Sequence, residues 1–149
     1  MLMTYKEIKA NLFDVGDDYA LAHCVSADFG MGKGIVIEFN RRFDMKNHLL
    51  RKYPYYYKEW VDNKREHGCL FELNVFNLIT KEHYWHKPTY SSIRGALEDM
   101  KIECLLHNIQ KVAMPKIGCG LDRLEWNKVR DIIFDVFADT AIDIKVCYL

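Results

Sequence analysis

Short apolar runs alternate with longer segments of helical periodicity along most of this chain. The runs at residues 4–9, 20–25, 70–73, 75–79, 111–114 and 141–147 have the length and composition of β-strands. Apolar side chains recur at helical spacing over about residues 34–43, 89–107 and 125–139, and in the second segment Ile93, Leu97, Met100 and Cys104 form one stripe. Such alternation predicts an α/β fold with a mostly parallel or mixed sheet covered on both faces.

Residues 53–60 concentrate aromatic side chains beside basic ones, directly after a segment that could form a short helix. Aromatic rings with basic neighbours can serve as a platform for stacked bases. However, aromatic side chains mainly supply buried area in folded proteins. We therefore favour a packed lobe that covers one edge of the sheet over a nucleic-acid platform.

The composition narrows the class of protein. A chain of 149 residues, half of them hydrophobic, is expected to form one domain over residues 1–149. Because 21 basic residues balance 21 acidic ones, non-specific nucleic-acid binding is not predicted. Five cysteines without a C-x-x-C pair suggest a reducing, cytoplasmic compartment. No signal-peptide pattern or membrane span is present, so we expect a soluble, unprocessed protein. We also expect it to be a monomer.

A turn of small residues separates the predicted strand at 111–114 from the last predicted helix. Pro115 ends the strand, and Gly118 and Gly120 permit positive φ, so backbone N–H groups can converge on one anion. The N-terminus of the helix adds partial positive charge. This pattern predicts binding of a diphosphate. The alternative is a plain turn in which Asp122 caps the helix and Glu125 completes a capping-box-like pair.

Two further loops follow predicted parallel strands and are expected at the same edge of the sheet. One carries glycines at alternate positions from Gly30 to Gly34 and opens into a helix, so it either approaches a ribose or phosphate or is a flexible turn. The other begins with Lys81, where loss of hydration would favour a nucleophilic amine, although lysines at strand ends commonly point into water. His83 and His86 in that loop lack partners of recognised ligand spacing, so we predict no metal.

These segments together resemble the macro domain, an ADP-ribose-binding fold, and within it the terminal ADP-ribose protein glycohydrolase (O-acetyl-ADP-ribose deacetylase) branch. The likeness covers nearly the whole chain, at residues 21–26, 31–35, 78–81, 86–90, 114–124 and the last strand up to Leu149. Its most specific part is the pair of motifs Ile79-Thr80-Lys81 and Gly118-Cys119-Gly120-Leu121-Asp122. The resemblance implies a three-layer α/β/α fold with a central mixed sheet of about six strands, an ADP-ribose cleft, and neither metal nor cofactor.

The resemblance also implies a reaction. Lys81 would attack the anomeric carbon of the distal ribose, and Asp122 would handle protons and help resolve the covalent adduct. The implied substrates are protein ADP-ribosylated on Glu or Asp, O-acetyl-ADP-ribose and, for some relatives, ADP-ribosylated DNA. An anomeric ester has a good leaving group, and an amine can trap the sugar as an iminium-type adduct. Two rivals stay open: a non-catalytic ADP-ribose reader and a phosphatase of ADP-ribose 1″-phosphate.

Positions of the ADP-ribose cleft carry over one by one from the resemblance. Asn11 stands where many macro domains have an adenine-binding Asp, and its carbonyl oxygen could accept one hydrogen bond without the charge. His23 and Ser26 match positions on the ribose side of the cleft, and Thr80 neighbours the proposed nucleophile. The other expected ligand-binding residues are Leu12, Asp28, Gly32, Gly34, Ile35, Pro115, Ile117, Gly118, Cys119, Gly120 and Leu121.

Overall fold

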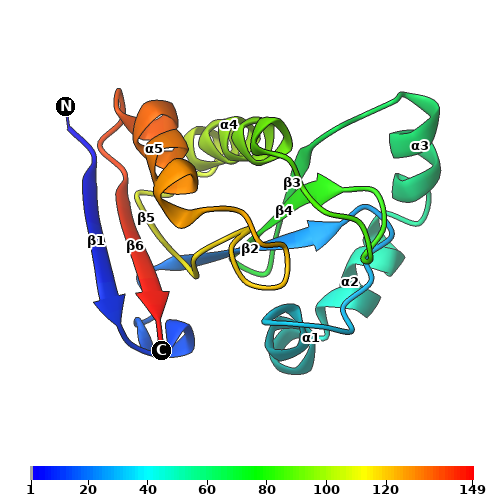
Figure 1. The fold of residues 1–149 in the computed structure, drawn as a ribbon. Coiled ribbons are helices and arrows are strands. Elements are labelled where there is room, and N and C mark those ends of the chain that lie inside the picture. Colours follow the sequence, from blue (N-terminus) through cyan, green and yellow to red (C-terminus); the bar gives the residue numbers. More distant parts are fainter. Residues whose placement is uncertain (1) are drawn as a thin grey trace.

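A single mixed sheet of six strands organises the computed structural model, which describes residues 2–149 (Figure 1). The strands lie in the order β1-β6-β5-β2-β4-β3. All neighbouring pairs are parallel except β3 and β4, which form an antiparallel pair at one edge. The strands are β1 (Thr4–Lys9), β2 (Ala20–Ser26), β3 (Gly68–Glu72), β4 (Val75–Lys81), β5 (Lys111–Met114) and β6 (Asp143–Tyr148). The predicted mixed sheet is confirmed.

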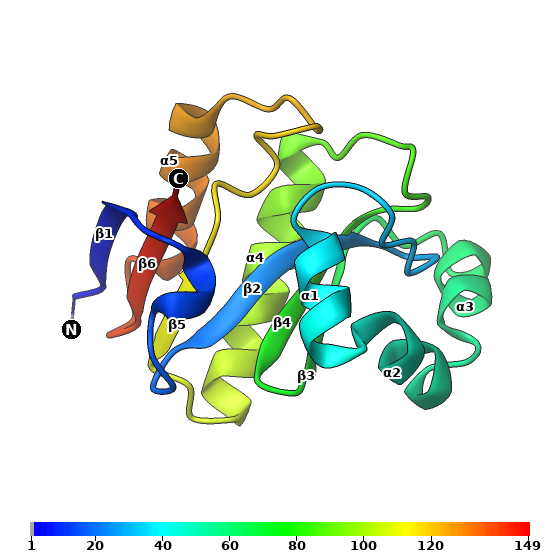
Figure 2. The same cartoon turned by 90° about the horizontal axis from the view of Figure 1, so that it is seen from below.

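Helices cover both faces of this sheet, which gives the three layers that the resemblance implied. On one face lie α4 (Tyr90–Leu106) and α5 (Trp126–Phe137), and on the other lie α1 (Val36–Phe43) and α2 (Met45–Lys52) (Figures 1 and 2). Each face has its own buried cluster: Met100 and Ile133 belong to the first, and Phe39 and Leu49 to the second. A short 3-10 helix, η1 (Leu12–Asp14), follows β1.

The helix α4 shows how closely local sequence sets an element. Thr89 accepts a hydrogen bond from the backbone N–H of Ser92, and the Ser92 hydroxyl accepts one from the N–H of Thr89, so the helix begins with a complete capping box. The predicted stripe of Ile93, Leu97, Met100 and Cys104 is fully buried against the sheet. The predicted range of 89–107 therefore matches the helix together with its two capping residues.

The aromatic segment at residues 53–60 is a packed lobe, as favoured above. It includes the first residues of α3 (Tyr56–Asp62), a helix that the apolar pattern did not predict, and it follows α2, the short helix expected before it, for which the apolar pattern gave no bounds. Tyr56 and Trp60 are buried in the second cluster, and the Tyr53 hydroxyl donates a hydrogen bond to Glu72 on the edge strand β3. The lobe thus covers the β3 edge of the sheet.

Candidate active site

A cavity of about 680 Å³ opens at the carboxyl ends of β2, β4 and β5. Its walls come from all three loops identified in the sequence, including Ser26 and Gly34 after β2, Lys81 at the end of β4, and Gly118 and Asp122 after β5. In the sheet, β2 lies between β4 and β5. The loop after β2 leads to α1 on one face, and the loop after β5 leads to α5 on the other face (Figures 1 and 2). The loops after β2 and β5 therefore diverge, which is where open α/β sheets bind ligands.

Lys81 and Asp122 form an ion pair inside this cavity. The Lys81 Nζ lies 2.9 Å from the Asp122 Oδ1, and the two side chains are only 13% and 17% exposed. Lys81 is the last residue of β4, and its carbonyl oxygen accepts a hydrogen bond from the N–H of Ala27. The ladder between β2 and β4 shifts register between Val25 and Ser26, a local irregularity of the kind that often aims side chains beside active sites.

The turn after β5 places Asp122 opposite the lysine. Gly118 has φ +74°, and its carbonyl oxygen accepts a hydrogen bond from the N–H of Leu124, which closes the turn. The alternative in which Asp122 caps α5 does not hold. The capping position belongs to Glu125, whose side chain makes no capping bond, and Arg123 has a φ of +61° that turns the chain before the helix starts. Asp122 is therefore free of a capping role and points to Lys81.

Glycine φ values separate two kinds of position in the loops. Gly34 and Gly118 have φ of +76° and +74°, a conformation that side-chain-bearing residues rarely adopt. Gly32 and Gly120 are not in that region, and a Cβ at either would meet no atom within 4 Å. Of the two glycines that permit positive φ in the third loop, only Gly118 uses it, whereas at Gly120 the relevant property is the open space around the backbone.

The cavity gathers positive charge although the chain as a whole is neutral. One carboxylate, Asp122, lines it together with five cations, which are Lys33, Lys81, Lys87, Lys116 and Arg123. Concave surfaces with an excess of one charge attract ligands of the opposite charge. The lining therefore suits an anionic ligand.

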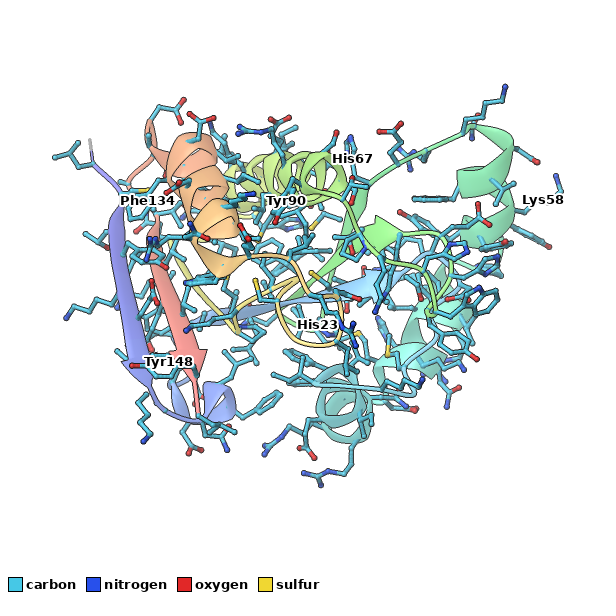
Figure 3. The ribbon with its side chains drawn as sticks, in the orientation of Figure 1. His23, Lys58, His67, Tyr90, Phe134 and Tyr148 are labelled. Atoms are coloured by element: carbon cyan, nitrogen blue, oxygen red, sulfur yellow. The ribbon has the colours of Figure 1, made fainter. Side chains whose placement is uncertain are left out.

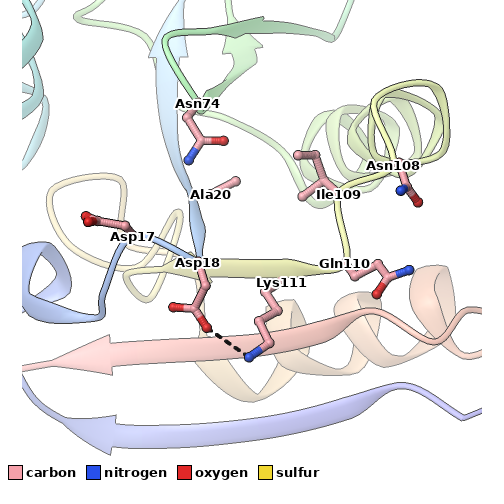
Figure 4. Close-up of a pocket in the computed structure, with 8 residues that line it drawn as sticks. All are labelled: Asp17, Asp18, Ala20, Asn74, Asn108, Ile109, Gln110 and Lys111. Carbon is pink, nitrogen blue, oxygen red and sulfur yellow. Dashed lines mark hydrogen bonds and ion pairs between the residues drawn. The ribbon is translucent and has the colours of Figure 1, made fainter.

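A second cavity lies at the opposite ends of β2 and β5 and has a different character. It measures about 430 Å³ and is lined mainly by polar residues, among them Asp18 and Lys111, which form an ion pair at 2.9 Å (Figure 4).

Within residues 2–149 we find no group of three or more His, Cys, Asp or Glu side chains arranged to hold a metal ion. No helix in the same range is both long and apolar enough to cross a membrane.

Comparison with known proteins identifies the fold and the family. The chain is 38% identical to the ADP-ribose glycohydrolase OARD1 of Bos taurus over 144 residues, which cover 93% of this chain and 88% of that protein. The OARD1 protein of Homo sapiens is 37% identical over the same shares. The solved macrodomain of Thermus aquaticus DarG aligns with a TM-score of 0.78 at 21% identity, covering 98% of this chain and 99% of that one. No family model matches.

The chain belongs to the macro domain family. Its similarity to the two OARD1 proteins extends over nearly the full length and places it among the glycohydrolase enzymes of the family. In this macro domain the residues expected at the ligand fall into three groups: those that line the cavity, those that stand behind its wall, and those that lie elsewhere.

The first group contains most of the expected ligand-binding residues. The cavity lining includes Ser26, Gly32, Gly34, Ile35, Pro115, Ile117, Gly118, Gly120 and Leu121, in addition to Lys81 and Asp122. These residues come from three segments far apart in sequence. The topology of the parallel strands was sufficient to predict that they meet.

Asp28, Thr80 and Cys119 stand behind the cavity wall. Burial alone would raise the pKa of Asp28, but hydrogen bonds from the Ser26 hydroxyl, the Gly30 N–H and His83 outweigh it and lower that pKa. Asp28 thereby remains a carboxylate that ties the first loop together. The Cys119 thiol donates to the Ile117 carbonyl oxygen, and burial raises its pKa to about 11.

His23, Asn11 and Leu12 lie elsewhere in the structure. His23 on β2 is fully buried, and Figure 3 labels its position in the middle of the molecule. Its ring stacks on Phe39 with 3.7 Å between ring centroids, and its Nε2 lies 2.7 Å from the Asn77 Oδ1. Burial lowers the pKa of His23 to about 4, so its ring is neutral. The Asn11 side chain accepts a hydrogen bond from the N–H of Phe13 and caps η1, and Leu12 is buried in the second core cluster.

Several lining residues were not predicted from the sequence. Tyr84, Trp85 and Lys87 come from the loop after β4, and the Lys87 Nζ donates a hydrogen bond of 2.6 Å to the carbonyl oxygen of Leu121. This contact joins the second and third loops across the cavity. The signals in the sequence were the position of these residues in a loop already selected for Lys81 and, for Lys87, a place in the segment 86–90 of the family resemblance.

Proposed function

We propose that this macro domain hydrolyses ADP-ribosyl esters, with Lys81 as nucleophile and Asp122 as acid and base. The observation that carries the proposal is the ion pair of Lys81 and Asp122, 2.9 Å apart and largely shielded from water in a cavity rich in cations. A reader of ADP-ribose needs loops that bind a diphosphate but no shielded amine next to a carboxylate. The pair therefore favours an enzyme over a reader.

The first step begins with a proton transfer. Asp122 accepts a proton from the Lys81 ammonium group, which frees the lone pair of the amine. The Nζ then attacks the anomeric carbon of the distal ribose, the bond from that carbon to the ester oxygen breaks, and its electron pair leaves with the carboxylate. Asp122 passes the proton that it accepted to the departing carboxylate and becomes a carboxylate again. The bond from the anomeric carbon to the ring oxygen then breaks, one proton of the attached nitrogen passes to that oxygen, and an iminium adduct remains on Lys81.

The second step restores the enzyme. Water adds to the iminium carbon and gives up a proton to the Asp122 carboxylate, which passes that proton to the nitrogen. The carbon–nitrogen bond then breaks as the new hydroxyl group becomes a carbonyl and its proton goes to the released lysine amine, which is again an ammonium group. The sum is one ester and one water converted to one carboxylic acid and one ADP-ribose. A negative Asp122 also stabilises the positive charge of the adduct, so the same carboxylate serves both steps.

The rest of the ligand is proposed to lie along the glycine turns. Backbone N–H groups near Gly34 and Gly118 suit a diphosphate, and Lys33, Lys116 and Arg123 supply charge. For adenine, the Asn11 oxygen that already accepts from Phe13 keeps one lone pair for a further donor. Recognition of adenine is thus proposed to depend on a neutral acceptor.

One experiment separates this proposal from its rivals. The purified protein is incubated with Glu-linked ADP-ribosylated protein, O-acetyl-ADP-ribose, ADP-ribosylated DNA and ADP-ribose 1″-phosphate, and products are read by mass spectrometry. We expect free ADP-ribose from the two esters, with release abolished in Lys81→Ala. Binding without turnover would support the reader, and phosphate release that Lys81→Ala retains would support the phosphatase.

We further propose that the protein acts in the cytoplasm. All five cysteines are free thiols, and burial raises the pKa of Cys24 to about 12 and of Cys104 to about 12. Buried, protonated thiols behave as small hydrophobic side chains and are typical of a reducing compartment. Fractionation of the native cell followed by immunodetection tests this assignment.

A further inference from the structure

The order of the strands indicates which end of the cavity would hold the diphosphate and which end would hold the leaving group. The glycine turns follow β5 and β2, Lys81 ends β4, and the loop of residues 82–87 continues from Lys81. If the diphosphate lies at the glycine turns and the anomeric carbon lies at Lys81, the leaving group extends toward this last loop. Two aromatic residues, Tyr84 and Trp85, line the cavity there.

These two side chains offer a large apolar surface at the cavity mouth. Trp85 is 60% exposed and Tyr84 is 48% exposed, although both contribute to the cavity lining. Tyrosine and tryptophan are the side chains that most often dominate binding energy at protein interfaces. Exposed rings that adjoin a reactive centre are therefore suited to hold whatever is attached to that centre.

The loop holds the two rings in place. The His83 ring lies parallel to the Trp85 ring, with 4.2 Å between centroids and 5° between planes. The Nδ1 of His83 is 3.2 Å from Asp28, and its Nε2 is 2.9 Å from the Tyr57 hydroxyl. Tyr84 packs directly on Gly30, where a Cβ would come within 2.8 Å of it. A surface fixed before binding loses little entropy when a partner docks.

The charges around this surface favour a polypeptide over a nucleic acid. The Glu82 carboxylate lies 3.0 Å from the His83 Nε2, and Asp28 stands on the other side of the same ring. Lys87, the only Lys or Arg between residues 82 and 87, already donates to the Leu121 carbonyl oxygen. Single-stranded nucleic acids need a track of cations beside the stacking rings. Carboxylates at that place would repel phosphodiesters.

We propose that Tyr84 and Trp85 form a subsite for the polypeptide that carries the ADP-ribosyl ester, and that they select protein substrates over small esters. This inference rests on the proposed function. It assigns specificity residues on the leaving-group side of the cavity, whereas Lys81 and Asp122 act on the sugar.

The test compares two substrates that share ADP-ribose and differ in the leaving group. O-acetyl-ADP-ribose carries only an acetyl group, and a Glu-linked ADP-ribosylated polypeptide carries a chain that reaches the rings. In Trp85→Ala we expect the ratio of kcat/KM for the polypeptide to kcat/KM for O-acetyl-ADP-ribose to fall roughly 5- to 30-fold, mainly through KM. Trp85→Phe recovers most of the ratio. Tyr55→Ala removes a ring that is 69% exposed outside the cavity and leaves the ratio unchanged.

Equal losses on both substrates in Trp85→Ala, or no loss on the polypeptide, would overturn the inference. A loss confined to an ADP-ribosylated single-stranded oligonucleotide would overturn the choice of polypeptide. Failure of the proposed function looks different, because the parent enzyme would then turn over neither ester before any substitution is made.

Discussion

The backbone conformation at Gly118 predicts that alanine at this position lowers the stability of the protein. Gly118 and Gly120 are two residues apart and both line the cavity, but only Gly118 has a positive φ, of +74°. Alanine at Gly118 would be forced into the left-handed region, which costs about 1–2 kcal/mol. Its Cβ would also lie 3.1 Å from the Leu124 Cδ1, a contact that the flexible leucine must relieve.

Gly118→Ala is therefore expected to lower the free energy of unfolding by about 1–2 kcal/mol, or the melting temperature by roughly 2–8 °C for a chain of this size. Gly120→Ala is the matched control. Its Cβ would meet nothing within 4 Å, so reduced freedom of the unfolded chain should leave stability unchanged or raise it by up to about 1 kcal/mol.

Urea unfolding followed by tryptophan fluorescence measures both variants, since the chain contains three tryptophans. Titration with ADP-ribose in a calorimeter adds a second readout. Gly118→Ala should also bind ADP-ribose more weakly, because the strain shifts the turn that we propose binds the diphosphate. Equal stability of Gly118→Ala and the parent, or a larger loss in Gly120→Ala, would refute the reasoning.

Two further predictions concern single side chains. For Asp122→Ala we expect ADP-ribose binding to persist while turnover falls roughly 10²- to 10⁴-fold or an adduct accumulates, and an unchanged progress curve would exclude the proposed role. For His23, whose pKa falls from 6.5 to about 4 on folding, the unfolded chain binds a proton that the folded chain excludes between those values. Stability that is present above pH 6.5 is therefore lost as the pH falls toward 4, by up to about 3 kcal/mol. Urea unfolding at pH 7 and pH 5 should show a smaller difference in His23→Phe than in the parent, and equal differences would count against this assignment.

Local sequence patterns were sufficient to predict the structure of segments whose conformation is set by their own residues. The capping box at Thr89 and the buried stripe from Ile93 to Cys104 both lie within α4, and the predicted range matched the helix with its caps. The parallel arrangement of the strands also allowed us to predict that three loops meet, because the carboxyl ends of parallel strands share one edge of the sheet. Prediction of the Lys81–Asp122 pair required both the local motifs that contain these residues and the topology that brings their loops together.

Non-local packing explains what the sequence could not reveal. The side chain of His23 is covered by Phe39 from α1, a contact that no periodicity predicts. The alternative role of Asp122 as a helix cap does not hold because Arg123 turns the chain with a φ of +61° before the helix begins at Trp126. The hydrogen bond from Lys87 to Leu121 joins two loops whose side-chain positions follow only from the assembled fold.

Reductive trapping tests the central claim most directly. The parent enzyme is allowed to turn over O-acetyl-ADP-ribose in the presence of cyanoborohydride, which reduces an iminium adduct to a stable amine, and tryptic peptides are then sequenced by mass spectrometry. We predict an ADP-ribose-derived modification on Lys81 that requires substrate and is absent from Lys81→Ala. Steady turnover with an unmodified Lys81, or with the modification on another lysine, would contradict the nucleophilic role of Lys81.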